Sequence, residues 1–258
     1  MLRWEDAGCT GIVLGVAPPG EQHAVSVAVP AAVPAFVRDC AIPLVVCSGA
    51  LAAVRGTATL IRTGKQIVLL TAAHLFDHRV RLGDLMLPLP ASGAWLNLDS
   101  AQVRCEIDAD IAVIRPDVQA QAALAKEWRA VPLEAVAGAG LAVGKDWMHY
   151  VAGYPAALTR LHAQWLVAKR LLVMSGELAP GCPAGESGRD LLLEYRRVAA
   201  RTDGQSIHTP PLDGVSGAAV WGIRCFGGRR HLMIVGVQSS FCHSRYLRAH
   251  RVTPLQIR

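Results

Sequence analysis

The sequence predicts an all-β fold of the sandwich or barrel class. From Ala41 to the C-terminus, short apolar runs alternate with Gly, Asp and Pro, a pattern typical of β-strands separated by turns. The runs do not alternate with helical patterns, as they would in a parallel α/β sheet. The chain has 258 residues, of which 52% are hydrophobic and 18% charged, so it can bury a sizeable core and is not expected to be disordered.

The predicted elements follow one another in chain order. Residues 1–40 are interpreted as an N-terminal extension or arm, because prolines interrupt their apolar stretch. Residues 117–146 are a predicted connector, in which 118–131 are rich in helix formers and a Gly-rich loop follows. Thr63-Gly64-Lys65 and Phe226-Gly227-Gly228-Arg229 each separate two apolar runs and predict hairpins. The predicted strands cover 42–46, 56–63, 66–74, 86–90, 110–116, 148–155, 165–174, 190–198, 217–223 and 231–240.

Several classes of protein are not expected. No stretch reaches the roughly 20 consecutive apolar residues of a membrane-spanning helix. Glu5 and Asp6 lie where a signal peptide would be basic and then apolar, so a cytoplasmic location is the expectation. The chain has seven cysteines without a CxxC pair, which argues against a disulfide framework or a zinc ribbon. Most of the cysteines are expected to be small buried hydrophobic residues.

The formal net charge is +6, and the basic residues are mostly arginines, many of them in the last third of the chain. A solvated basic surface is the simplest interpretation, because net charge affects how a protein attracts charged partners and does not by itself identify its function. No RNA-binding aromatic motif, zinc finger or helix-turn-helix supports a nucleic-acid partner. An adaptor that binds nucleic acid or an acidic protein through this arginine-rich part is the weakest of three functional hypotheses.

Ser216 is the first candidate for chemistry. Gly214 and Gly217 flank it, and an apolar strand follows at once, which predicts a tight turn that glycine permits. If the amides of Gly214 and Ser216 point the same way, they form an oxyanion hole beside the Ser216 hydroxyl. A second GxSG copy at 185–188 lies in a Pro- and Gly-rich polar stretch and is interpreted as a surface loop.

A serine nucleophile needs a histidine base and a carboxylate that orients the base. His74 ends an apolar strand, and Asp110 opens the next convincing one. Asp108 lies two residues away and would share a face with Asp110 in an extended strand; Asp110 is preferred because it directly precedes IAV. The order His, Asp, Ser is the order of the chymotrypsin arrangement.

The segments GTATLIRTGKQIVLLTAAHLF, DIAVI and DGVSGAAV closely resemble the three motif blocks of trypsin-like (chymotrypsin-fold) serine peptidases, particularly compact bacterial members without disulfides. VAGYP at 151–155 resembles the first strand of that family's second barrel, and IVGVQSS at 234–240 resembles the strand that lines its substrate cleft. The resemblance covers about Ala41 to the C-terminus. It implies two antiparallel six-stranded β-barrels, at about 41–116 and 147–258, with the active site in the cleft between them.

The resemblance also implies a serine endopeptidase that acts on protein or peptide substrates. His74 would take the proton of Ser216, Asp110 would orient the imidazole, and the amides of Gly214 and Ser216 would bind the oxyanion. Val215 stands where secreted members carry the aspartate that pairs with a newly formed N-terminus, so activation by that ion pair is not expected.

Substrate preference is predicted from four positions. Six residues before Ser216, the family's selectivity position falls on Pro210, which is not the acid that would predict cleavage after Arg or Lys. Ser239, Ser240 and Phe241 align with the pocket wall and would suit a neutral side chain of small or moderate size.

A second hypothesis is a protease-fold binding or regulatory module whose site is gated or vestigial. Val215 supports it, because the oxyanion turn could need a regulatory protein partner or a substrate to order it. No membrane partner, cofactor or metal is expected. His74 and His78 are four residues apart, but no third ligand is evident nearby, as a metal site would need.

Overall fold

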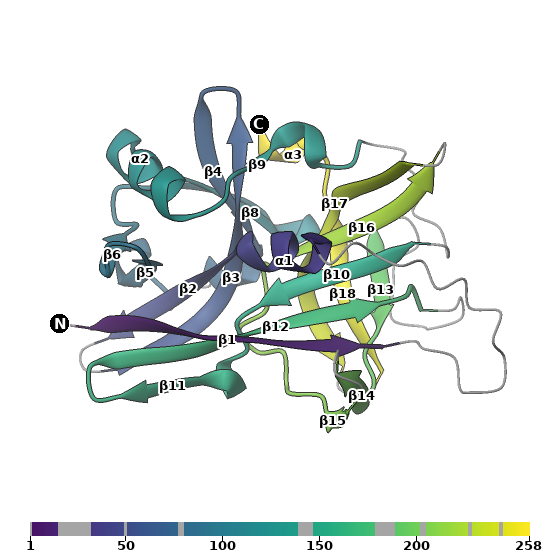
Figure 1. Cartoon of the computed structure of the whole chain (residues 1–258). Helices are drawn as coiled ribbons and strands as arrows, with labels where there is room; N and C mark the ends of the chain where they lie inside the picture. The colour runs from purple at the N-terminus through teal and green to yellow at the C-terminus, as the bar shows by residue number, and fades with distance from the viewer. Residues whose placement is uncertain are drawn as a thin grey trace, which may run out of the picture.

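The computed structural model describes residues 2–14, 32–48, 51–76, 80–138, 147–178, 189–201, 205–226, 229–242 and 245–258. The predicted all-β fold is confirmed, since strands dominate these residues and form two sheets (Figure 1). Their pairing does not by itself resolve into two six-stranded barrels, so the barrel arrangement stays a prediction.

The first sheet is built from residues 41–132 and has the strand order β6-β5-β2-β3-β4-β8-β7, with β9 pairing with β3. The predicted hairpin at Thr63-Gly64-Lys65 is confirmed, because Thr63 pairs with Gln66 across it and Gly64 has a φ of +63°. The strands are β2 (Ala41–Ser48), β3 (Leu51–Thr63), β4 (Gln66–Thr71), β5 (Leu85–Leu89), β6 (Ala94–Asn97), β7 (Gln102–Glu106), β8 (Ile111–Arg115) and β9 (Val131–Pro132).

The second sheet has the order β13-β18-β17-β16-β10-β12-β1-β14-β15, with β11 pairing with β12. In the second predicted hairpin, Phe226 pairs with Arg229; the two glycines between them lie outside the described residues. The strands are β1 (Arg3–Val13), β10 (Met148–Gly153), β11 (Thr159–His162), β12 (Trp165–Ser175), β13 (Asp190–Glu194), β14 (Val198–Arg201), β15 (Ser206–His208), β16 (Ala219–Phe226), β17 (Arg229–Cys242) and β18 (Tyr246–Arg251).

The second sheet separates two hydrophobic cores. Tyr150 and Trp221 belong to the core shared with the first sheet, whereas their sequence neighbours Val151 and Val220 belong to a second core on the other face. This follows from strand geometry, because successive side chains point to opposite faces of a sheet. When a strand is buried on both faces, its sequence is a continuous apolar run, as in the segments around Tyr150 and Trp221.

One predicted strand, 190–198, is wrong as a single element. It divides into β13 and the start of β14, which lie at opposite ends of the second sheet. The chain changes direction at Tyr195, which is fully buried and whose hydroxyl donates to the carbonyl of Pro210. Burial of this ring outweighs the tendency of the apolar run to continue.

Described parts of the predicted N-terminal extension fold against the second sheet. β1 runs parallel to β12 along its whole length, as Figure 1 shows. Trp4 packs edge-on against Tyr154, with ring centroids 5.6 Å apart, and Arg170 of β12 pairs with Asp6. Helix α1 (Ala32–Asp39) follows and lies beside β10, where Phe36 packs against Trp221 in the same edge-on manner.

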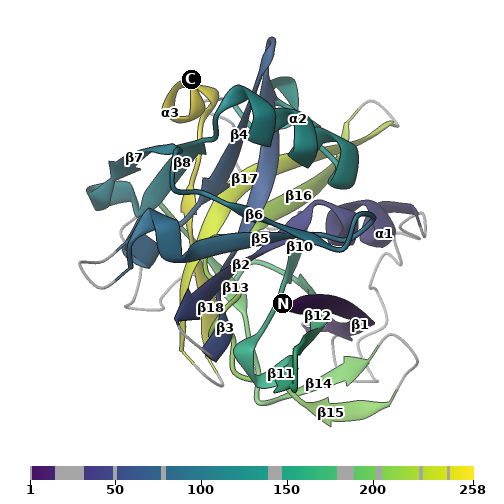
Figure 2. The same cartoon turned by 90° about the vertical axis from the view of Figure 1, so that its left-hand side faces the viewer.

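Two further helices belong to the described chain. The predicted helix at 118–131 is confirmed as α2 (Val118–Glu127), whose N-cap Asp117 accepts a hydrogen bond from Ala120 N–H. It ends early because Trp128 is extended and its indole donates to Pro88. Helix α3 (Pro254–Ile257) lies beside β7, as Figure 2 shows. No helix among the described residues has the length and apolar character needed to span a membrane.

Of the cysteines whose side chains the structure describes, all five are free thiols. Cys40 is buried as expected, and burial raises the pKa of its thiol to about 12. Cys9, Cys47 and Cys242 are partly exposed and Cys105 is exposed on β7, so the expectation that most cysteines are buried is wrong for the described ones. The exposure of Cys105 follows from its place on β7, an edge strand with mostly exposed side chains.

Candidate active site

His74 lies in a short 3-10 turn (Ala73–Phe76) just after β4. A single carboxylate, that of Asp110, contacts it twice. The backbone N–H of His74 donates to Asp110 Oδ1 at 2.8 Å, and the ring Nδ1 lies 2.8 Å from Oδ2 and 3.0 Å from Oδ1. A carboxylate on Nδ1 selects the tautomer with the proton on that nitrogen, so Nε2 is left as the basic atom.

Asp110 has an unusual backbone. It ends the 3-10 turn Ile107–Ala109 with a φ of +48° and a ψ of +41°, the left-handed conformation. Few residues other than glycine adopt it, and such strain gathers at functional sites. Asp108, the alternative acid, is exposed in the same turn and makes no hydrogen bond to His74. The left-handed residue ends the turn and starts β8, so the two acids do not share a strand face.

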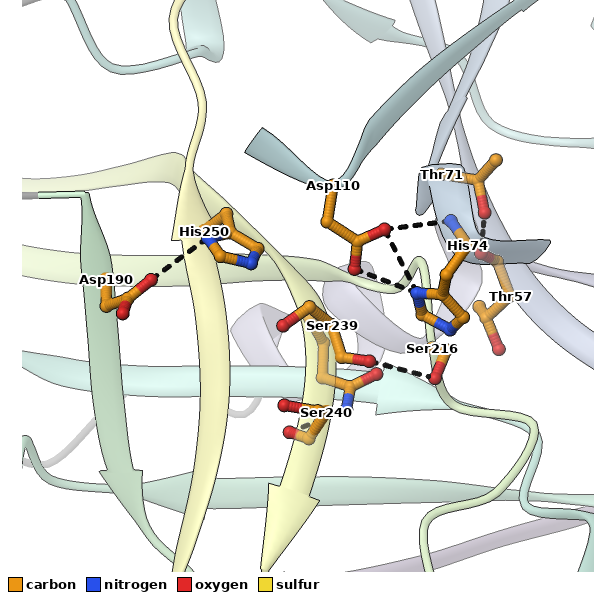
Figure 3. Close-up of polar contacts among 10 residues, drawn as sticks. Thr57, Thr71, His74, Asp110, Asp190, Ser216, Ser239, Ser240 and His250 are labelled. Atoms are coloured by element: carbon orange, nitrogen blue, oxygen red, sulfur yellow. Dashed lines mark hydrogen bonds and ion pairs between the residues drawn. The ribbon is translucent and has the colours of Figure 1, made fainter. Parts of the chain in front are cut away.

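Ser216 lies in the turn between Leu212 and Ala219, just before β16, an inner strand of the second sheet. Its hydroxyl donates to the carbonyl oxygen of Ser239 on β17 at 3.3 Å. In Figure 3 the side chain of Ser216 lies below the His74 ring, on the side of the ring away from Asp110. The segments that carry His74 and Ser216 meet at Gly56, where a Cβ would lie 2.3 Å from the Leu75 side chain and 2.9 Å from the Ser216 carbonyl oxygen. The Ser216 hydroxyl itself is hydrogen-bonded to Ser239.

The peptide planes around Ser216 are fixed by their carbonyl groups. Asp213 C=O accepts from Ala156 N–H at 2.6 Å, and Val215 C=O accepts from Ala218 N–H at 2.9 Å. These two peptides also carry the N–H groups of Gly214 and Ser216, whose directions are fixed with the carbonyls because a peptide is planar. Neither N–H has a hydrogen-bond acceptor within the described part of the chain, as an oxyanion hole requires.

Both glycines of the turn are required by the backbone. Gly214 and Gly217 have φ values of +91° and +92°. A Cβ on Gly217 would lie 2.3 Å from the carbonyl oxygen of Thr57, and one on Gly214 would lie 2.6 Å from that of Tyr154. Backbone atoms that close leave room for hydrogen only.

Val215 is buried and belongs to the second core. Its side chain lies against Gly153 of β10, where a Cβ would come within 2.8 Å of a Val215 methyl group. An apolar side chain thus anchors the turn in the second core. It occupies the position at which secreted members of the family that the sequence resembles carry an aspartate.

The four predicted pocket residues are only partly brought together. Ser239 is buried and reaches Ser216 through its carbonyl, whereas Ser240 is exposed. Pro210 and Phe241 are linked through one residue, Tyr195, which donates to the carbonyl of Pro210 and packs edge-on against the Phe241 ring at 6.2 Å.

Sequence reasoning missed a second histidine–carboxylate cluster, drawn at the left of Figure 3. The Asp190 carboxylate, only 2% exposed, pairs with Arg248 Nη2 at 2.8 Å and with His250 Nδ1 at 3.0 Å. β18, which carries two of these residues, was not predicted either. The alternation of Leu247 and Ala249 with longer polar side chains was the signal that could have identified it.

The sequence analysis also passed over Thr57, Thr71 and Gln238, whose hydrogen bonds surround the Ser216 turn. As to metals, no group of three His, Cys, Asp or Glu side chains in the described residues could hold an ion. His78 and the second GxSG copy, 185–188, lie outside the described residues.

Comparisons with known proteins identify no family for this chain. No protein-family model and no curated protein matches the chain. A solved structure matches with 14% identity over 83% of this chain and 85% of its own, at a TM-score of 0.48. Its description concerns aromatic interactions that drive the coupled folding and binding of the intrinsically disordered VPg protein of Sesbania mosaic virus. At this TM-score the likeness determines neither family nor function.

Proposed function

We propose that this chain is a serine endopeptidase of the trypsin-like type that cleaves peptide bonds in proteins or peptides. The observation that carries the proposal is the Asp110 carboxylate on both the backbone N–H and the ring Nδ1 of His74. A base oriented in this way, beside a serine and two unoccupied N–H groups, is what acyl transfer requires. The proposal includes two six-stranded barrels with the site between them.

The mechanism needs side chains and backbone amides alone. Ser216 Oγ attacks the substrate carbonyl carbon while its proton passes to His74 Nε2, and the carbonyl π electrons move onto oxygen. The N–H groups of Gly214 and Ser216 donate to that oxyanion, and Asp110 stabilises the imidazolium. The C–N bond then breaks as Nε2 returns the proton to the leaving amine. Water, deprotonated by Nε2, hydrolyses the acyl ester in the same way.

We further propose a neutral side chain of small or moderate size next to the cleaved bond. Pro210 brings no charge to the selectivity position. The buried carboxylate of Asp190 is already paired with Arg248 and His250, so it is not available to bind a basic side chain.

A fluorophosphonate probe tests the proposal on the purified full chain. We expect one label, located on Ser216 by mass spectrometry of the peptides. The label should be absent in Ser216→Ala and nearly absent in His74→Ala, while circular dichroism shows that both variants are folded. Absence of a label on folded wild-type protein, or a label that persists in Ser216→Ala, would contradict the proposal.

A second candidate function is a protease-fold binding or regulatory module with a gated site. The observation that favours it is the Ser216 hydroxyl, which donates to Ser239 and not to His74. Activation requires rotation of this side chain toward Nε2. A folded protein that the probe does not label would make this candidate the leading one.

A further inference from the structure

Thr57 of β3 joins the two halves of the molecule at the Ser216 turn. It is fully buried, and its polar atoms contact the turn and its neighbours. Its backbone N–H donates to the Ser216 carbonyl at 2.8 Å, and its hydroxyl donates to the Gly214 carbonyl at 2.9 Å. The same hydroxyl accepts from Tyr154 N–H at 3.2 Å. Figure 3 shows Thr57 between Thr71 and Ser216.

These bonds complete the set that fixes the turn. The peptides that carry the Gly214 and Ser216 N–H groups are held through the carbonyls of Asp213 and Val215. Thr57 holds the peptide that follows each of these two. The Thr57 hydroxyl donates to the carbonyl of Gly214, and the Thr57 N–H donates to the carbonyl of Ser216. Only two backbone dihedrals are free per residue, so consecutive planes fixed in this way leave the turn little freedom.

Thr57 also connects the turn with the strand that leads to the base. Its carbonyl oxygen accepts from the hydroxyl of Thr71, the last residue of β4, at 2.8 Å. His74 follows three residues later. One residue of the first sheet therefore contacts both the turn with the nucleophile and the strand that leads to the histidine.

We propose that Thr57 is a positioning residue for the oxyanion hole, acting through the carbonyls of Gly214 and Ser216 and not by touching the substrate. This inference rests on the proposed function. Valine has the shape of threonine but can neither donate to Gly214 nor accept from Tyr154, so both buried groups would lose their partner. A displaced turn would then misdirect N–H groups whose nitrogens must lie about 2.7–3.1 Å from the oxyanion.

The test is the second-order rate of fluorophosphonate labelling at Ser216 in a set of matched variants. In Thr57→Val we expect a rate about 10- to 100-fold below wild type, less than the about 10²–10³-fold cost of losing a whole oxyanion donor, because the donors are displaced and not removed. Thr57→Ser keeps the hydroxyl and should label within about threefold of wild type. Thr59→Val is the control, because Thr59 is a buried threonine of the same strand that does not contact the turn.

With a test ester, the loss in Thr57→Val should fall on kcat and leave KM nearly unchanged. A general loss of packing would not be rescued by serine and would also appear in Thr59→Val. If Thr57→Val does not fold, Thr57→Ala removes the same hydroxyl with less crowding and carries the same expectation. A folded hydroxyl-free variant that labels at the wild-type rate overturns the inference, whereas an unlabelled wild type overturns the proposed function itself.

Discussion

Acid should weaken this fold through one buried histidine, His149 of β10. The side chain is fully buried, and neither ring nitrogen has a hydrogen-bond partner in the described part of the chain. Its ring stacks on Trp147, with centroids 6.5 Å apart and planes inclined by 17°. Burial, followed by the positive charge of Arg251, lowers the pKa of His149 from 6.5 to about 4.

The sign follows from proton binding. Between pH 6.5 and 4 the unfolded chain binds a proton at His149 and the folded chain does not, so stability falls as the pH falls. The contribution is fully present above pH 6.5 and has been lost once the pH reaches the folded-state pKa of about 4. Each pH unit in this window corresponds to about 1.4 kcal/mol, which gives a loss of about 3 kcal/mol in unfolding free energy.

Urea unfolding at half-unit steps from pH 7 to pH 4 measures this loss. Other groups titrate in the same range, so the comparison is with His149→Leu, or with His149→Met if leucine packs badly. The wild type should lose about 3 kcal/mol more than the folded variant over this range. A difference between the two proteins that stays constant with pH would refute the reasoning.

Three further changes test the site and its surroundings. Gly217→Ala, at a φ of +92° against a backbone oxygen, should cost about 2–4 kcal/mol of unfolding free energy in urea, and a wild-type midpoint would contradict this. Asp110→Asn should slow probe labelling of Ser216 by about 10⁴-fold in a folded protein, through the wrong histidine tautomer; a loss below tenfold would argue against the pairing. Trp4→Ala should lower the unfolding free energy by about 2–4 kcal/mol through lost contacts with Tyr154, measured against a conservative Trp4→Phe.

Local sequence signals predicted the elements whose causes are local. The hairpin at Gly64 needs a residue that tolerates positive φ, and the α2 helix was predicted from the helix formers of its own segment, 118–131. Both signals lie within a few residues of the structure that they specify. The juxtaposition of His74 with Asp110 was predicted by a resemblance in motif order, because spacing alone carries no information about contacts between distant strands.

Long-range features could not be read in the same way. The parallel pairing of β1 with β12 joins residues more than 150 positions apart, and β1 alternates too weakly to identify its partner. The left-handed Asp110 is equally hidden, because aspartate is also an ordinary residue at the start of a strand. In both cases, contacts between distant parts of the chain decide the conformation, and their energy outweighs the local preference of the sequence.

Val215 joins the two kinds of evidence. The identity of this residue indicated that the turn lacks an acid that could pair with a newly formed N-terminus. It did not indicate which contacts hold the turn instead. The replacement is burial of its side chain in the second core, together with hydrogen bonds from Thr57 to the carbonyls of Gly214 and Ser216. An ion pair of this kind forms only after cleavage, whereas an apolar contact and a buried threonine form as the chain folds. A turn held in this way requires no processing step to reach its conformation, so any gating of the site must act on the Ser216 side chain or on access to it.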